Sequence, residues 1–261
     1  MKVVELRFYG KLVFLSKVSS MRVAFYGRRT IKDVVESLGV PHTEIFLVLR
    51  NQTITYLNQI IEHNDRISLY PMFFQMDREI LREILTSTKL TCEEKKEYVK
   101  KYKIKFKQKF IADVHLGKLT RYLRLLGIDV LFNPKWNDFE LIQISNQEKR
   151  VLLTQDKGIL KQKRLEYGYY LISRTPSEQL QEILSHFHLK IKPFQRCSIC
   201  NSILKYVDSS EILELQPIPV WLMETYEGFY VCEKCKKVYW EGSHYKKMVE
   251  FFYKYKLDFE K

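Results

Sequence analysis

Four of the five cysteines in this 261-residue chain form two matching pairs, and these pairs constrain its fold more than any other feature. They are Cys197 and Cys200, then Cys232 and Cys235, so 31 residues separate one C-x2-C pair from the next. Each pair can present two thiolates from a tight turn, and four thiolates make a tetrahedral zinc site. The interval exceeds the usual ~15–20 residues, so a hairpin or a longer loop has to fill it. We therefore predict a structural zinc ribbon over residues 193–250.

Other readings of the cysteines are weaker. Redox-active C-x2-C pairs are the main alternative, but two matching pairs favour structural zinc. Disulfides are rare inside cells, and we expect an intracellular chain because the N-terminus lacks the apolar run and cleavage site of a signal peptide. Cys92 has no partner in the pattern and is interpreted as an incidental thiol.

Residues 1–73 have the element order of a β-grasp domain. Thr30 is a residue type that caps helices, and Gly39 is one that ends them. Two strands, this helix and two more strands are predicted at 3–8, 21–26, 30–39, 45–49 and 66–70.

Residues 74–109 are predicted to form a basic helical linker. This segment carries a net charge of +5, the largest excess of the chain relative to length. A solvated helix face is one interpretation of its lysines. Contact with a phosphate backbone is the other.

From residue 110 onward, predicted strands and helices alternate, which is typical of an α/β fold. The strands are expected at 110–112, 128–132, 151–154 and 169–172, and the helices at 116–126, 138–147, 157–164 and 176–187. Four such units predict a parallel sheet covered by helices on both faces. The motifs GxGxxG, Walker A and GxSxG are absent, which weakens nucleotide-binding and serine-hydrolase interpretations.

Three aspartates are expected at the carboxyl edge of this sheet, where ligands bind in open parallel sheets. Asp113 directly follows the first strand, Asp156 follows the third by two positions, and Asp138 opens the helix between them. Carboxylates that converge repel one another unless a divalent cation lies between them, and oxygen ligands suit Mg²⁺ or Mn²⁺. Such ions promote phosphodiester cleavage. The alternative is that these aspartates are ordinary helix caps.

The whole chain carries a net charge of +13, which points to a polyanionic partner, nucleic acid first. Lys118, Arg121 and Arg124 share a broad face of the helix after Asp113 and are candidates for holding an RNA backbone. The alternative is a solvated amphipathic helix.

Aromatic residues follow the second cysteine pair. Tyr239, Trp240 and His244 could stack on unpaired bases. Packing of the small ribbon against its neighbour domain is the more common role of such residues.

Four stretches resemble the Mut-seven C-terminal (Mut7-C) ribonuclease family in order and spacing. They are Phe110–Gly127, Leu152–Asp156, Pro193–Cys197 and Tyr239–His244. The resemblance covers residues 110–250. It implies a PIN-like domain over 110–192 followed by the zinc ribbon, and a metal-dependent ribonuclease with Asp113, Asp138 and Asp156 as metal ligands.

Residues 1–73 resemble the ubiquitin-like domain that often precedes this family. The match lies in Phe8–Gly10, Leu38–Glu44 and Asn64–Pro71. This domain is related to sulfur carriers, but no Gly-Gly follows Pro71, so we do not expect a carrier role.

The chain departs from the family at several positions. Thr154-Gln155-Asp156 stands where the family usually has Thr-Arg-Asp, and Tyr167-Gly168 stands in place of His-Gly. A fourth acidic ligand is not evident, with Glu140 and Glu178 as unsupported candidates.

The sequence therefore predicts a β-grasp domain, a helical linker, a PIN-like nuclease domain and a zinc ribbon, with a tail at 251–261. The predicted function is hydrolysis of RNA by a cytoplasmic enzyme with structural zinc and catalytic Mg²⁺ or Mn²⁺. The alternatives are a non-catalytic RNA-binding protein and a β-grasp partner module of another enzyme. The sequence contains no stretch of ~20 apolar residues, the length that a membrane-spanning helix needs. Assembly into a homo-oligomer is possible.

Overall fold

The computed structural model describes residues 1–71, 78–88, 90–105, 109–187, 189–212 and 218–254. The chain divides into two compact units. The first comprises Met1–Lys107 and Trp136–Ile172, and the second comprises Gln108–Lys135 and Ser173–Lys261. None of the helices in the described ranges combines the length and apolar character that a membrane crossing needs.

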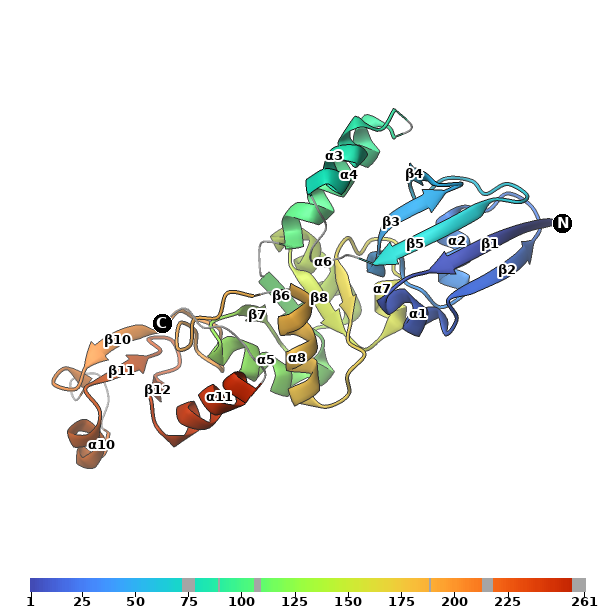
Figure 1. Ribbon diagram of the computed structural model, residues 1–261. Coiled ribbons are helices and arrows are strands. Elements are labelled where there is room, and N and C mark those ends of the chain that lie inside the picture. The colour runs from blue at the N-terminus through green and yellow to red at the C-terminus, as the bar shows by residue number, and fades with distance from the viewer. Residues whose placement is uncertain (72–77, 89, 106–108, 188, 213–217, 255–261) are drawn as a thin grey trace. The chain divides into compact units, whose positions relative to one another are not determined.

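Five strands of the first unit form one mixed sheet (Figure 1). The strand order β2-β1-β5-β3-β4 places the parallel pair β1 and β5 in the middle, and the remaining neighbours are antiparallel. The bounds are β1 Lys2–Phe8, β2 Ser20–Phe25, β3 Ile45–Arg50, β4 Thr53–Thr55 and β5 Arg66–Pro71. This order confirms the prediction of a β-grasp domain.

Helix α2 (Ile31–Ser37) covers this sheet and begins where the sequence predicts. Thr30 and Asp33 form a capping box in which each side chain accepts a hydrogen bond from the backbone N–H of the other, at 3.1 and 3.0 Å. The apolar face of α2 joins the core through Ile31, Val34 and Val35. A short helix α1 (Lys11–Ser16), which the sequence analysis did not predict, adds Leu12 and Leu15 to the same core.

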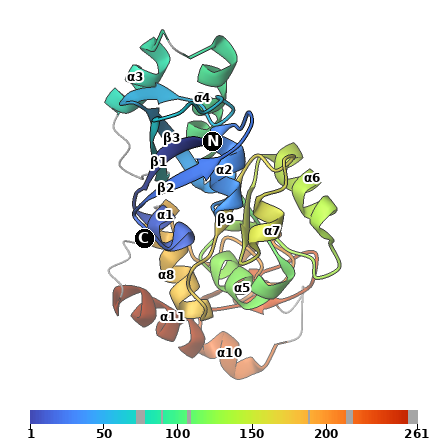
Figure 2. The same ribbon diagram turned by 90° about the vertical axis from the view of Figure 1, so that its right-hand side faces the viewer.

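The predicted linker contains two helices, α3 (Arg78–Thr86) and α4 (Cys92–Lys105), which run side by side in both ribbon views (Figures 1 and 2). They pack on the sheet through Tyr98, which is 1% exposed and whose hydroxyl donates to the Thr55 carbonyl at 2.8 Å. The ring of Tyr98 also contacts those of Phe46 and Tyr56, edge to face. One side of α4 is therefore anchored, while Lys96 and Lys100 are exposed.

The lysine-rich stretch continues through residues 106–108, which lie outside the described part of the chain. Contact between this stretch and a phosphate backbone stays a prediction.

The other part of the first unit contains two helices and two strands. They are α6 (Asp138–Glu148), β8 (Val151–Thr154), α7 (Lys157–Leu160) and β9 (Gly168–Tyr170). Strands β8 and β9 pair in parallel, as the predicted α/β fold requires.

Helix α7 ends four residues earlier than predicted, and the residues after it make a contact distant in sequence. The Asn146 side chain of α6 donates to the Arg164 carbonyl at 2.6 Å and accepts from the Glu166 N–H at 3.1 Å. Residues 161–164 therefore form a loop held against α6.

A buried ion pair joins the β-grasp domain to β9. Lys11 Nζ and Glu44 Oε2 lie 3.0 Å apart, and the two side chains are 12% and 3% exposed. Lys11 also donates to the Tyr170 carbonyl, and Glu44 accepts from the Tyr170 N–H, so this pair satisfies both backbone groups of one strand residue. The Lys11 ammonium lies over the Tyr169 ring, 3.2 Å from its centroid.

Further polar contacts of the same kind surround this pair. His42 Nε2 lies 3.2 Å from the Leu165 carbonyl oxygen, and Thr43 donates to the Leu160 carbonyl at 3.4 Å. The β-grasp domain therefore holds both ends of the segment from α7 to β9.

The second unit begins with a parallel pair of strands, β6 (Lys109–Ala112) and β7 (Asp129–Leu131). A 3-10 turn (Val114–Leu116) and helix α5 (Gly117–Leu125) connect them, and α8 (Pro176–Phe187) packs on α5. Gly127, at φ +82°, follows α5; a Cβ there would lie 2.2 Å from the Lys192 carbonyl oxygen, so only glycine allows this close approach.

The C-terminal part of this unit is a three-stranded antiparallel sheet with the order β10-β11-β12. Its strands are β10 Lys205–Asp208, β11 Gly228–Val231 and β12 Val238–Tyr239. Two helices accompany it, α10 (Val220–Thr225) and α11 (Ser243–Lys254). The arrangement agrees with the predicted zinc ribbon.

Replacement of Lys11 by methionine tests the buried ion pair. The methionine keeps the apolar stem but leaves the Glu44 carboxylate buried without its cation, which typically costs about 3–5 kcal/mol of unfolding free energy. The control Lys2→Met breaks the more exposed pair with Glu62 and should cost at most about 1 kcal/mol. Urea unfolding measures both, and equal losses would contradict this assignment.

Candidate functional site

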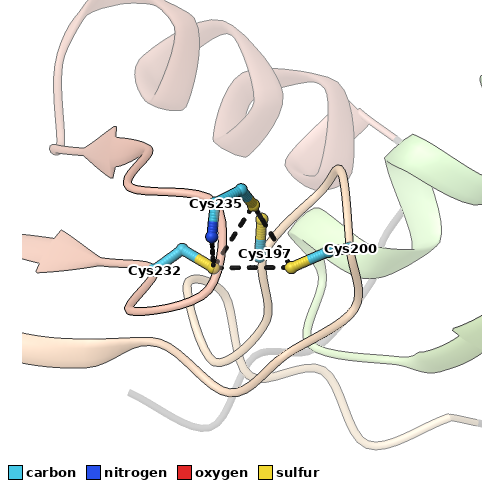
Figure 3. Close-up of side chains that lie close together, drawn as sticks. All are labelled: Cys197, Cys200, Cys232 and Cys235. Carbon is cyan, nitrogen blue, oxygen red and sulfur yellow. Dashed lines mark hydrogen bonds between the residues drawn. The ribbon is translucent and has the colours of Figure 1, made fainter.

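The four paired cysteines come together at one end of the ribbon sheet (Figure 3). All four sulfur atoms lie within 4.8 Å of one another, and the described residues hold no other such group of three or more His, Cys, Asp or Glu ligand atoms. Sγ–Sγ distances include 3.3 Å for Cys197–Cys235, 3.4 Å for Cys200–Cys232 and 3.2 Å for Cys200–Cys235. A tetrahedron with Zn–S bonds of ~2.3 Å has edges of about 3.8 Å, so small adjustments would fit a zinc ion.

The two turns that present the cysteines have the same backbone pattern. The N–H of Asn201 donates to the Cys197 carbonyl at 3.0 Å, and the N–H of Lys236 donates to the Cys232 carbonyl at 2.8 Å. Asn201 and Lys236 each have positive φ, 67° and 57°. Each pair therefore sits on a tight knuckle that aims both thiols at one point, as the C-x2-C spacing predicts.

The environment of the cluster affects the ionisation of its thiols. Burial raises the pKa of Cys232 and of Cys235. Burial acts in the same sense on Cys200, but hydrogen bonds with Ser202 and the neighbouring thiols lower its pKa to about 6. The thiolate that a metal ion needs therefore forms more readily at Cys200 than at Cys232 or Cys235.

Arg124 is part of the scaffold that supports this cluster. It is 4% exposed. Its Nε donates to the Val130 carbonyl at 2.8 Å, and its Nη1 donates to the Ile199 carbonyl at 2.6 Å. Burial lowers the pKa of Arg124, and the nearby Cys197 opposes this effect. The guanidinium is thus committed to backbone carbonyls, and the prediction that Arg124 holds RNA does not fit this position.

Lys118 and Arg121, the other two predicted RNA contacts, are exposed on α5. Their role stays a prediction.

The aromatic residues after the second pair serve packing. The Tyr239 hydroxyl accepts from the Ser198 N–H at 3.1 Å and lies 3.2 Å from Cys197 Sγ. Trp240 packs against the buried core of the ribbon. These contacts favour the packing interpretation over base stacking for both residues, while the side chain of His244 lies outside the described set.

The predicted catalytic aspartates differ in their local roles. Asp113 caps the turn after β6, where its Oδ1 accepts from the Val114 N–H at 2.5 Å. Asp156 caps α7, where its Oδ1 accepts from the Gly158 N–H at 2.6 Å. Asp138 is not a cap, because Asn137 precedes it and accepts from the Glu140 N–H at 3.0 Å.

Capping and metal binding are compatible for Asp113 and Asp156, since each cap uses only one oxygen of the carboxylate. Asp113 belongs to the second unit, and Asp138 and Asp156 belong to the first. The three-carboxylate site therefore stays a prediction.

The two candidates for a fourth acidic ligand both make hydrogen bonds at the start of a helix. Glu140 completes the capping box of α6 by accepting from the Asn137 N–H at 2.9 Å. Glu178 accepts from the Thr175 hydroxyl at 2.8 Å at the start of α8. Gln155, where the family usually has arginine, donates to the Leu171 carbonyl at 3.4 Å.

An open groove of about 790 Å³ runs between α6 and the end of α7, and we call it the α6–α7 groove. Its lining includes Asp138 and Gly158, the residue whose N–H the Asp156 carboxylate caps. Asp138 thus lines the groove, and Asp156 is hydrogen-bonded to another lining residue. The sequence does not indicate this groove, because Asn146, which holds the loop after α7 and lines the groove, belongs to no recognisable motif.

Comparison with known proteins agrees with this architecture. The family model described as Mut7-C RNAse domain matches residues 108–252, and the model described as Mut7-C ubiquitin matches residues 1–77. No curated protein matches the chain. Two crystal structures of the small archaeal modifier protein 1 from Haloferax volcanii are similar to it. Each is 21% identical, with a TM-score of 0.24, and they cover 27% and 28% of this chain and 98% and 97% of their own.

The cysteine cluster predicts one zinc ion per chain. Cys197→Ser removes one thiolate and should abolish stoichiometric zinc binding, while Cys92→Ser, at an exposed cysteine outside the cluster, should keep it. Elemental analysis of the purified proteins measures both. Full zinc in Cys197→Ser, or none in the unmodified chain, would contradict the assignment.

The buried position of Arg124 predicts a structural effect. Arg124→Met leaves the Val130 and Ile199 carbonyls without their donors and should cost about 1–3 kcal/mol of unfolding free energy. Arg121→Met, on the exposed face of the same helix, should stay within about 0.5 kcal/mol. Thermal unfolding compares the two, and faster zinc release to a chelator in Arg124→Met alone would confirm the link to the cysteines. Equal stability of the two variants would refute it.

Proposed function

Because the chain belongs to the Mut7-C RNAse domain family, we propose that it is a divalent-metal-dependent ribonuclease that hydrolyses RNA phosphodiester bonds. Asp113, Asp138 and Asp156 are the proposed catalytic residues and ligands of Mg²⁺ or Mn²⁺. The observation that best supports this is the position of Asp138. Its side chain is exposed and lines the α6–α7 groove, and the cap of α6 is Asn137 rather than Asp138.

The donor set suits the proposed ion. Carboxylate oxygens are the ligands that Mg²⁺ and Mn²⁺ prefer. Asp156 has a fixed orientation, because one oxygen is held by the start of α7; a Cβ at Gly158 would lie only 3.0 Å from that oxygen. A bound Mg²⁺ or Mn²⁺ would supply an activated water and neutralise charge on the scissile phosphate.

The residues around the carboxylates have supporting roles in this proposal. Lys118 and Arg121 are exposed cations on the helix that follows Asp113, and they hold the RNA backbone. The ribbon, with one zinc ion on its four cysteines, has a structural role, because a closed site of four thiolates leaves no open position for chemistry.

A non-catalytic RNA-binding protein is the second candidate. It would use the same basic surface, and the capping roles of Asp113 and Asp156 favour it, since a cap alone explains both side chains. Cleavage of a labelled RNA pool with and without Mg²⁺ or Mn²⁺ separates the two functions.

Substitution of Asp156 by asparagine tests the mechanism. Asparagine caps a helix about as well as aspartate, so the fold should keep its stability while one anionic ligand is lost. Cleavage should fall at least about 100-fold, the loss typical when one electrostatic contact to the transition state is removed. RNA binding should stay nearly unchanged.

Asp138→Asn should behave in the same way, and Asp208→Asn, at an exposed residue of β10, should remain fully active. Metal-dependent cleavage at the unmodified rate by both Asp156→Asn and Asp138→Asn would remove this mechanism and leave the RNA-binding function.

A further inference from the structure

The α6–α7 groove has the composition of a site for a polyanion. Lys161, Lys163 and Arg164 line it, against one acidic lining residue, Asp138. None of the three cations forms an ion pair with a carboxylate in the described ranges of the chain. Positive charge also accumulates next to the groove: burial and the like charge of Lys161 both lower the pKa of Lys157.

The groove also contains an exposed aromatic ring. Phe139 is 59% exposed, whereas Leu141 and Ile142, in the next turn of α6, are buried. A single exposed apolar residue is common on protein surfaces. An exposed ring that shares an open groove with three unpaired cations is the combination that binds single-stranded nucleic acid, in which bases stack on rings and cations follow the backbone.

The cations are presented by a loop of defined shape. Asn146 holds the Arg164 carbonyl and the Glu166 N–H, and the Leu165 N–H donates to the Gln162 carbonyl at 3.0 Å. Leu160 and Leu165 are buried on either side of the loop. Residues 161–164 therefore present their charges from a fixed backbone, which reduces the entropy lost when a ligand binds.

We propose that the α6–α7 groove binds single-stranded RNA, with a base stacked on Phe139 and backbone phosphates held by Lys161, Lys163 and Arg164. The proposal rests on the proposed ribonuclease function for the identity of the polymer. It adds that the bound RNA is single-stranded and that it runs past Asp138 and the start of α7. Paired bases cannot stack on Phe139, so a duplex lacks this contact.

Binding is measured on full-length, zinc-loaded protein that carries Asp156→Asn, so that cleavage does not interfere. The probes are a fluorescently labelled 12-nucleotide single-stranded RNA and a duplex of the same length, followed by anisotropy at several salt concentrations. The groove variants are Phe139→Ala and the double variant Lys163→Glu/Arg164→Glu. Their matched controls are Tyr26→Ala, at an exposed ring of the β-grasp domain, and Lys149→Glu, at the far end of α6.

Phe139→Ala should weaken single-strand binding about 5- to 150-fold, the range for loss of one stacked base, and leave duplex binding unchanged. The double variant should lower the salt dependence by about 1.4 log units per log unit of salt, or about 0.7 for each lost phosphate contact. Both controls should bind like the parent protein.

The proposal is overturned if Phe139→Ala and the double variant both bind single-stranded RNA as tightly as the control variants do. The groove would then be a candidate site for a protein partner. Equal losses for single strand and duplex in Phe139→Ala would overturn the stacking contact. These outcomes are independent of cleavage. If the unmodified protein fails to cleave RNA with Mg²⁺ or Mn²⁺ but the groove variants lose binding as expected, the ribonuclease function fails and the binding groove stands.

Discussion

Two short strands, β7 and β9, each have one edge without a neighbouring strand, and the backbone N–H and C=O groups on that edge need other hydrogen-bond partners. β7 and β9 each have a parallel ladder with one neighbour, β6 and β8. An unpaired strand edge exposes backbone donors and acceptors and invites association with other chains. Here side chains from the flanking domains occupy those groups. Lys11 and Glu44 of the β-grasp domain satisfy the carbonyl and N–H of Tyr170.

At β7 the equivalent contacts come from Asn201 of the ribbon and from Arg124 of α5. Arg124, held against the first cysteine knuckle, donates to the Val130 carbonyl, and Asn201 of that knuckle accepts from the Val130 N–H at 3.2 Å. Each flanking domain thus contributes side-chain hydrogen bonds to one strand of the α/β region. This gives the β-grasp domain a structural role that does not require a Gly-Gly terminus or a carrier function.

Much of this architecture follows from local sequence signals, but the contacts that shape the site do not. The cysteine spacing predicts the knuckles, and Thr30 with Asp33 predicts the start of α2, because both patterns act over four residues. Arg124 has the sequence environment of an exposed cation, and its burial depends on carbonyls about 75 residues away. Likewise, nothing near Lys157 indicates that α7 ends after one turn and that Asn146 holds the loop after it against α6.

The central claim is that carboxylates of this chain use a divalent ion to cleave RNA. Its most direct test is the single-turnover cleavage rate of a labelled single-stranded RNA as Mn²⁺ is titrated, with the unmodified protein and Asp138→Asn compared. The account predicts a rate that rises from background and saturates with Mn²⁺ in the unmodified protein, and no saturable rise in Asp138→Asn. Cleavage that is independent of Mn²⁺, or identical titration curves for the two proteins, would contradict it.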